Sequence, residues 1–360
     1  MSFDNDHYWS LAQYIYMSGK NSIMDTSNTD DESYDTVEYR SLHSMATSSL
    51  RRETMFNEEM EAYNNDDPFY ADGLIKDILN GYEYTSETRY VRASVIYNTV
   101  MTHVLYPYIL GEMNDAIFKC VDGSVDKFMT GDRRSNTESN QAWDQVAAFL
   151  IGSLEGSRTG GSEDFSDGVF LWSLANKRGI EFSRLNSDGY AIVNEQLQSY
   201  LVSGKGRIQH SSCDDLSRMA TNIAYMLLIP MVQTMIKYAI TNQFIDWKSG
   251  DIDVEVFQGE IYAKFMIPIY QKFKEIESAL AIQKNMIRNI GALVADGPQV
   301  VADTFLPLAD DIGIQCEYIG KSFEVNGCQN YEPSSQTSDG KRRIVNSVTF
   351  FATFAALFLF

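Results

Sequence analysis

Apolar residues recur at intervals of three and four along most of this chain, and alternating apolar and polar residues are scarce. An interval of three to four keeps apolar side chains on one face of a helix, whereas a strand needs an interval of two. Prolines number only seven in 360 residues, which suits long helices. We therefore predict an all-α fold, a large helical bundle. The predicted helices lie at about 8–17, 37–63, 68–79, 89–119, 141–154, 165–177, 188–202, 213–244, 254–274, 275–294 and 300–310.

Two segments of long apolar helices resemble each other distantly, Met101–Tyr108 and Met231–Tyr238. They suggest two helical halves of similar plan that pack as a pseudo-symmetric bundle, with chance similarity as the alternative. The predicted divisions are an N-terminal helical half at 1–130, incomplete at its start, a C-terminal helical half at 131–325, a polar stalk at 326–346 and a hydrophobic tail at 347–360.

The tail, Ser347–Phe360, carries no charge and follows the basic cluster Lys341-Arg342-Arg343. A helix of that length reaches about 21 Å, short of the roughly 30 Å of a bilayer core. Upstream, Ser338-Asp339-Gly340 supplies small residues and a polar spacer follows, the layout of a glycosylphosphatidylinositol signal with Ser338 as the attachment site. The alternative is a short tail anchor or a truncated membrane helix, with the basic cluster on its cytoplasmic side. Both interpretations predict attachment to a membrane.

The other end of the chain has no matching signal, because Met1–Asp6 shows neither a basic start nor an apolar run. A lipid-anchor tail requires entry into the secretory pathway. We therefore expect a chain that is incomplete at its N-terminus, with insertion of the tail after translation as the alternative. The predicted location is the secretory pathway leading to the cell surface or a periplasmic space.

The formal net charge is −20, which argues against nucleic acid and against anionic membrane surfaces as partners. Cations are the natural small partners of such a surface, and solubility alone is the alternative explanation. The cysteines are too far apart for a CxxC metal site, and their even number fits disulfides formed in an oxidising compartment. The spacing does not reveal their pairing, and four free thiols are the alternative. The cysteines are Cys120, Cys213, Cys316 and Cys328.

The usual enzyme motifs are missing from the sequence, including GxSxG, HExxH, a Walker loop and a strand-borne GxGxxG. We therefore predict that the protein is not an enzyme. Only four histidines are present, which disfavours a multi-histidine zinc site. Oxygen donors are abundant instead, with 49 acidic residues and 21 tyrosines. Hard cations such as Fe(III) prefer carboxylate and phenolate oxygens, so this chemistry is open to the chain.

Two acidic groups stand out as candidate metal ligands. Asp144 and Glu155 are eleven residues apart on one predicted helix, so they share a face but lie about 16 Å apart, too far to share one ion. Glu155 is the better candidate because glycines flank it at the helix end, although pairing with a basic residue is the alternative. For Asp144 the alternative is a charge at the helix start. The second group opens a long helix, and its alternative role is a solvated face. Its members are Glu255, Glu260 and Tyr262.

One further helix brings together Arg92, Tyr97 and His103 at spacings of five and six, so the three are only partly on one face. The guanidinium of Arg92 suits an anion such as carbonate. Tyr97 and His103 are possible additional ligands, and a buried core histidine is the alternative for His103.

Five phrases of this sequence stand out, in order: Ala12–Ser22, Tyr39–Ala46, Ala147–Gly156, Leu174–Arg178 before Phe182, and Gly313–Gly320. Taken together, they resemble the low-iron-inducible periplasmic proteins of algae. This family includes the iron-assimilation, high-CO2-inducible proteins of green algae and is related to the phytotransferrins of diatoms. The resemblance runs, with gaps, from about Tyr8 to Gly320.

The resemblance implies a secreted or cell-surface helical protein that aids iron acquisition, in phytotransferrins by binding ferric iron with carbonate as a synergistic anion. The family's iron ligands cannot be carried over residue by residue. The expected partners are iron, carbonate and a membrane, without nucleic acid, and the uptake partner is unknown. The alternative is a structural or adhesive surface protein that binds no metal. The predicted ligands are Glu155, Glu255, Glu260 and Tyr262, with Arg92 for the anion and His103, Asp144 and Tyr97 as additions.

Overall fold

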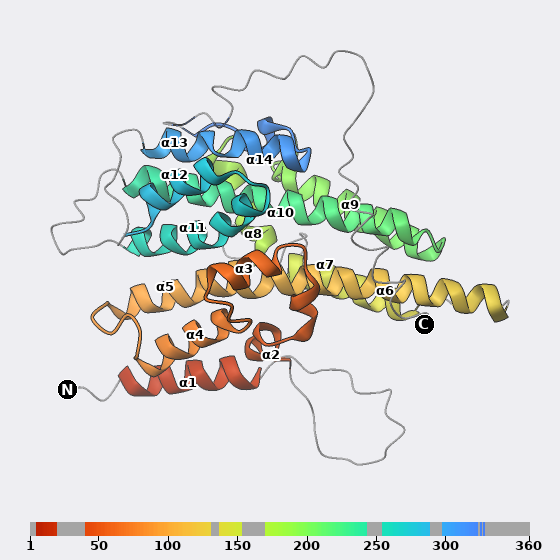
Figure 1. Cartoon of the computed structure of the whole chain (residues 1–360), viewed down its shortest axis with the longest axis horizontal. Coiled ribbons are helices and arrows are strands. Elements are labelled where there is room, and N and C mark those ends of the chain that lie inside the picture. The colour runs from red at the N-terminus through yellow and green to blue at the C-terminus, as the bar shows by residue number, and fades with distance from the viewer. Residues whose placement is uncertain are drawn as a thin grey trace. The chain divides into compact units, whose positions relative to one another are not determined.

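A computed structural model describes residues 5–19, 40–130, 137–152, 170–242, 254–288, 297–322, 325 and 327. Within these ranges the regular structure is helical and no strand is present; the β features are single bridges, among them the antiparallel one between Leu185 and Ala191. The predicted all-α fold is therefore confirmed (Figure 1). The described residues belong to one compact unit, Met1–Gln329, and Asn330–Phe360 form a second unit. The predicted tail and its attachment residue Ser338 lie in that second unit, outside the described residues.

The helices fall into α-helices, two short 3-10 helices (η1 and η3) and one π-helical segment (η2). In chain order they are α1 (Asn5–Ser18), α2 (Leu42–Ala46), η1 (Ser49–Glu53), α3 (Asn57–Tyr63), α4 (Tyr70–Asn80), α5 (Arg89–Thr99), η2 (Val100–Leu105), α6 (Tyr106–Thr130), α7 (Thr137–Ile151), α8 (Leu171–Glu181), α9 (Ile192–Gln209), α10 (Cys213–Asn242), α11 (Val254–Lys272), α12 (Ile276–Met286), α13 (Gly297–Asp303), α14 (Phe305–Ile312) and η3 (Cys316–Tyr318).

Helix α10 forms the centre of the core. It packs against α6, α8, α9, α11 and α13, and the stretch Met226–Ile236 is buried on all sides. Among the described residues it is the one helix long and apolar enough to cross a membrane, but most of its apolar stretch is buried inside the protein. Helices of the two expected halves pack directly on each other, since α5 contacts α11 and α6 contacts α10.

The chain from Arg89 to Thr130 forms one long rod, α5–η2–α6, as Figure 1 shows. Its centre is the π-helical segment η2, a wider turn that is often found at functional sites. Pro107 lies in the first turn of α6, directly after η2. The wider turn therefore accommodates the proline without ending the rod.

The single helix predicted at 37–63 is wrong. The chain instead forms three short helices, α2, η1 and α3. Ser41 and Ser44 form a capping box at the start of α2, and the Ser48 side chain accepts a hydrogen bond from the Leu50 N–H at the start of η1. Serine side chains that bond the nearby backbone compete with a continuous helix, which explains the interruption.

A disulfide joins Cys120 on α6 to Cys213, the first residue of α10. Cys316 is disulfide-bonded as well. The alternative of free thiols is therefore wrong for the described cysteines, and the predicted disulfides fit an oxidising compartment.

Candidate metal centre

Three tyrosines from three helices lie near one buried arginine. Tyr97 is on α5, Tyr238 on α10 and Tyr262 on α11, and Arg178 comes from α8. The ring centroids of Tyr238 and Tyr262 are 6.1 Å apart. Tyr238 and Tyr262 are buried, whereas Tyr97 keeps 40% of its surface exposed. We call these four residues the tyrosine cluster; it extends from the core towards solvent at Tyr97.

The protonation of these phenols is set by burial and by the arginine. Burial raises the pKa of Tyr97, Tyr238 and Tyr262, that of Tyr238 to about 12, and the positive charge of Arg178 opposes the rise in each. A hydrogen bond with Thr234 also works to lower the pKa of Tyr262. All three phenols are therefore protonated at neutral pH, and a metal ion that binds their oxygens must displace protons.

Arg178 is 5% exposed and pairs with Glu181, which also lies 2.9 Å from the Nζ atom of Lys237. The Nε atom of Arg178 is buried and makes no hydrogen bond. A buried guanidinium donor without an acceptor is costly, and an oxyanion is the acceptor that guanidinium geometry fits best.

Of the predicted ligands, Glu255, Tyr262 and Tyr97 belong to this region. Glu255 lies in the first turn of α11, and its negative charge contributes to the raised pKa of Tyr238. The structure therefore brings one carboxylate and two predicted tyrosines together, and adds Tyr238 and Arg178.

Glu260 is also buried, but its partners are different. Its carboxylate lies 2.7 Å from Lys264 Nζ and 2.6 Å from Arg288 Nε. Burial alone would raise the pKa of Glu260, but the two cations together lower it. Glu260 and Tyr262 are two residues apart on α11, so they point to different sides of the helix. The structure does not bring Glu260 to the tyrosine cluster.

Arg92, predicted to hold an anion, has other contacts. Its guanidinium lies 4.1 Å from the ring centroid of Trp9 on α1 and donates to the carbonyl of Ile78 at the end of α4. Arg92 and Trp9 line a pocket between α1, α4 and α5. Arg92 therefore bridges helices away from α8, α10 and α11.

His103 lies in η2 and is buried. Its Nδ1 atom is 3.0 Å from the Tyr70 hydroxyl, and its ring also bonds the carbonyl of Ile261. Burial lowers the pKa of His103 to about 3. The geometry matches the alternative of a satisfied core histidine.

Of the predicted pair Asp144 and Glu155, the structure describes only Asp144. Asp144 is on α7 and lies 2.9 Å from Lys205 Nζ on α9, in an exposed ion pair. Helix α7 ends at Ile151, and Glu155 lies outside the described residues.

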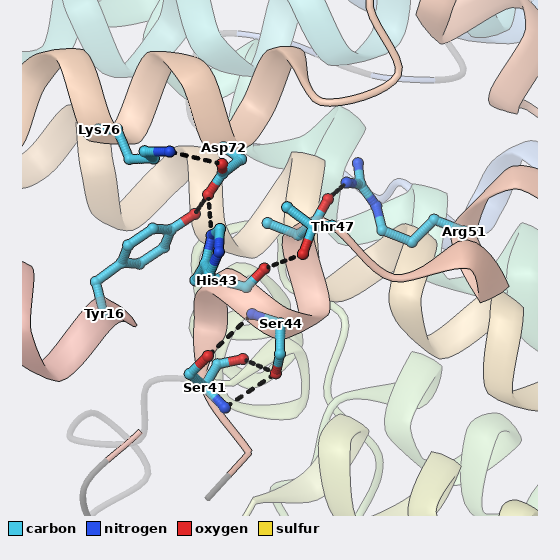
Figure 2. A network of polar contacts seen from close by, with 9 residues as sticks. Tyr16, Ser41, His43, Ser44, Thr47, Arg51, Asp72 and Lys76 are labelled. Carbon is cyan, nitrogen blue, oxygen red and sulfur yellow. Dashed lines mark hydrogen bonds and ion pairs between the residues drawn. The ribbon is translucent and has the colours of Figure 1, made fainter. Parts of the chain in front are cut away.

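A second polar network joins α1, α2 and α4 at the carboxylate of Asp72 (Figure 2). One oxygen of Asp72 accepts a hydrogen bond from the Tyr16 hydroxyl at 2.8 Å and lies 2.7 Å from His43 Nδ1; the other lies 3.6 Å from Lys76 Nζ. Because three groups surround one buried carboxylate, we interpret the network as a clamp that holds α1 and α2 on α4.

Two members of the tyrosine cluster, Tyr238 and Arg178, were not among the site residues predicted from the sequence. Both lie in phrases that the sequence had marked for other reasons: Tyr238 ends one of the two similar segments, and Arg178 ends the phrase Leu174–Arg178 of the family resemblance. Sequence position indicated these phrases, but only the packing of α8 on α10 relates them.

The described residues contain no group of three histidine, cysteine, aspartate or glutamate side chains able to hold a metal ion. Searches of protein families, curated proteins and solved structures find no match to this chain.

Proposed function

We propose that this protein is a membrane-anchored, non-enzymatic protein of the cell surface or periplasmic space that binds Fe(III) for uptake. The observation that supports this proposal is the tyrosine cluster with Glu255 at its side. Phenolate and carboxylate oxygens are hard donors, which suit a small and highly charged ion. The family resemblance of the sequence points to the same ion.

In this proposal Arg178, rather than Arg92, holds carbonate beside the iron. The Nε atoms of both arginines are buried without an acceptor, so their surroundings decide between them. Arg92 bonds Ile78 and stacks on Trp9, whereas the charge of Arg178 acts on all three phenols of the tyrosine cluster. An anion at Arg178 would accept a hydrogen bond from the Nε atom of this arginine and supply oxygen ligands to the metal.

The proposed site releases iron in acid. Each phenol that becomes a ligand loses a proton, and the raised pKa values mean that this proton is lost with difficulty. Lower pH therefore favours the protonated phenols and weakens the binding of iron. Protonation of carbonate acts in the same direction.

The test is a titration of the full chain with chelated ferric iron, with and without bicarbonate, at pH 8 and pH 5. We expect tight binding that requires bicarbonate, a visible tyrosinate-to-iron absorption band, and loss of binding at pH 5. Y238F and Y262F should each weaken binding and the absorption band. The matched control is Y270F, which removes another buried phenol, one that bonds Thr304 at 3.1 Å.

A second pair of variants separates the two arginines. R178K should remove the dependence on bicarbonate, because a lysine cannot reproduce the guanidinium fork. R92K should leave it unchanged. Failure of the wild-type protein to bind iron under every condition would favour the alternative, a structural or adhesive surface protein.

A further inference from the structure

Helix α1 is apolar on both of its sides. Its inner side, with Trp9, Ala12 and Tyr16, packs against the core, and its neighbours are α2 and α4 (Figure 1). The stretch from Tyr8 to Ser18 contains no charged residue, in a chain whose net charge is −20. A helix that is apolar all round is usually buried all round, so the outward side of α1 needs an explanation.

Helix α1 also lies beside the two ends of the connection between α4 and α5. The ring of Tyr8 lies 5.7 Å from the Arg89 guanidinium, and Gln13 donates a hydrogen bond to Asn80 at 3.0 Å. These contacts place the α4–α5 connection beside α1. We call the combined surface the tyrosine face; its exposed residues are Tyr8, Leu11, Tyr14, Ile15, Tyr82 and Tyr90.

We propose that the tyrosine face lies against a neutral lipid bilayer. Tyrosine has an apolar ring and a polar hydroxyl, and it concentrates where hydrocarbon meets headgroups, while Leu11 and Ile15 supply apolar area on the same face. Residues Tyr8 to Ser18 carry no charge, so an anionic surface would not repel this stretch of α1. It would repel the acidic remainder of the protein.

The composition of the chain also selects a bilayer as the partner. The inference rests on the proposed membrane anchor, because the apolar tail 347–360 keeps the protein at a bilayer. Residues 328–346 span at most about 65 Å when fully extended, so the anchor leaves enough chain for a surface of the folded unit to lie on the membrane. A second copy of the chain, which would have to bring two strongly acidic molecules together, is less suited to this face.

The experiment uses the full chain bound to phosphatidylcholine liposomes. A fluorophore is attached at Ser10→Cys, on the outward side of α1, or at the control position Val202→Cys, an exposed site on α9. Brominated lipid is then added as a quencher. We expect loss of fluorescence from the label at position 10 and none from the label at position 202.

A double variant, L11D/I15D, tests whether the apolar side chains carry the contact. It should abolish quenching at position 10 while the protein still sediments with the liposomes through its tail, and an unchanged circular dichroism spectrum would show that it folds. Sedimentation without quenching of the wild-type label would overturn this inference alone, as would shielding of the label by a dimer without lipid. Failure to sediment would overturn the anchor and this inference together, and iron binding would still be judged by its own titration.

Discussion

His103 is a single residue that the fold keeps neutral. It lies in η2, with one ring nitrogen 3.0 Å from the Tyr70 hydroxyl and a second bond to the carbonyl of Ile261. Burial, with smaller contributions from the nearby cations Arg51 and Lys264, lowers its pKa to about 3. His103 therefore stays neutral in the folded protein at pH values below about 6.5, where the same histidine binds a proton in the unfolded chain.

This difference predicts a loss of stability in acid. His103 contributes stability that is fully present above about pH 6.5 and is lost as the pH falls, by about 1.4 kcal/mol for each pH unit until the folded pKa is reached. H103Q cannot bind that proton, so the free energy of unfolding should depend less on pH between 6.5 and 4 in the variant. Denaturant unfolding at several pH values measures the slope. H210Q, at an exposed histidine, should keep the slope of the wild-type protein; a wild-type slope in H103Q would contradict the prediction.

At the scale of single elements, Arg51 links η1 to the π-helical segment. It is 3% exposed and donates to the carbonyl of His103 at 2.8 Å and to the carbonyl of Ala46. Both carbonyls belong to other elements, so one guanidinium connects α2, η1 and η2.

Replacing Arg51 by methionine keeps much of the side chain's volume but leaves both buried carbonyls without this donor. Hydrogen bonds from a charged group contribute about 1.5–3 kcal/mol each, so we expect R51M to lower the free energy of unfolding by about 3 kcal/mol. Denaturant unfolding measures the change. The matched variant R218M removes an arginine that is exposed and should change stability by less than about 0.5 kcal/mol. Equal effects of the two variants would show that Arg51 does not stabilise the π-helical segment.

The helical elements were predictable where one apolar face repeats along a long segment. The predictions 213–244 and 254–274 agree closely with α10 (Cys213–Asn242) and α11 (Val254–Lys272), because burial selects the same residues as the periodicity. The prediction failed at 37–63, where the serine caps interrupt the helix. Periodicity records which face is buried, but it does not record a local hydrogen bond that ends the helix.

The candidate site was predictable only in part, for a similar reason. The sequence analysis named Tyr97 on α5 and Glu255 and Tyr262 on α11 as candidate ligands. The fold places all three in one region. Glu260 was selected with them but faces Lys264 and Arg288. Tyr238 and Arg178 come from helices that are distant in sequence, and tertiary packing alone brings them to the site. A sequence can supply donors of the right type without showing which of them are already paired.

At the scale of the whole molecule, the disulfide between Cys120 and Cys213 connects α6 to the central helix α10 across 93 residues of sequence. Between its two cysteines the chain includes α7, α8 and α9, so the bond closes a loop that contains much of the bundle. A loop of that size loses considerable entropy when it is closed in the unfolded chain, which raises the free energy of the unfolded state. The acidic charge adds to the need for such a link, because a net charge of −20 repels itself in the compact state.

The double variant C120S/C213S should therefore lower the free energy of unfolding by about 4 kcal/mol, with a smaller loss if the unfolded chain keeps residual structure. Both sites are buried, and serine there adds a small polar cost to the lost link.

A reductant separates the two contributions, since reduced wild-type protein loses the link but keeps its sulfur atoms. Reduced wild type should lose most of the same stability, and it also loses the disulfide of Cys316. The double variant itself should respond to reductant only through Cys316. Denaturant unfolding of both proteins, with and without reductant, gives the four values. Stability in C120S/C213S equal to that of the oxidised wild type would mean that packing around α10 alone holds the bundle together.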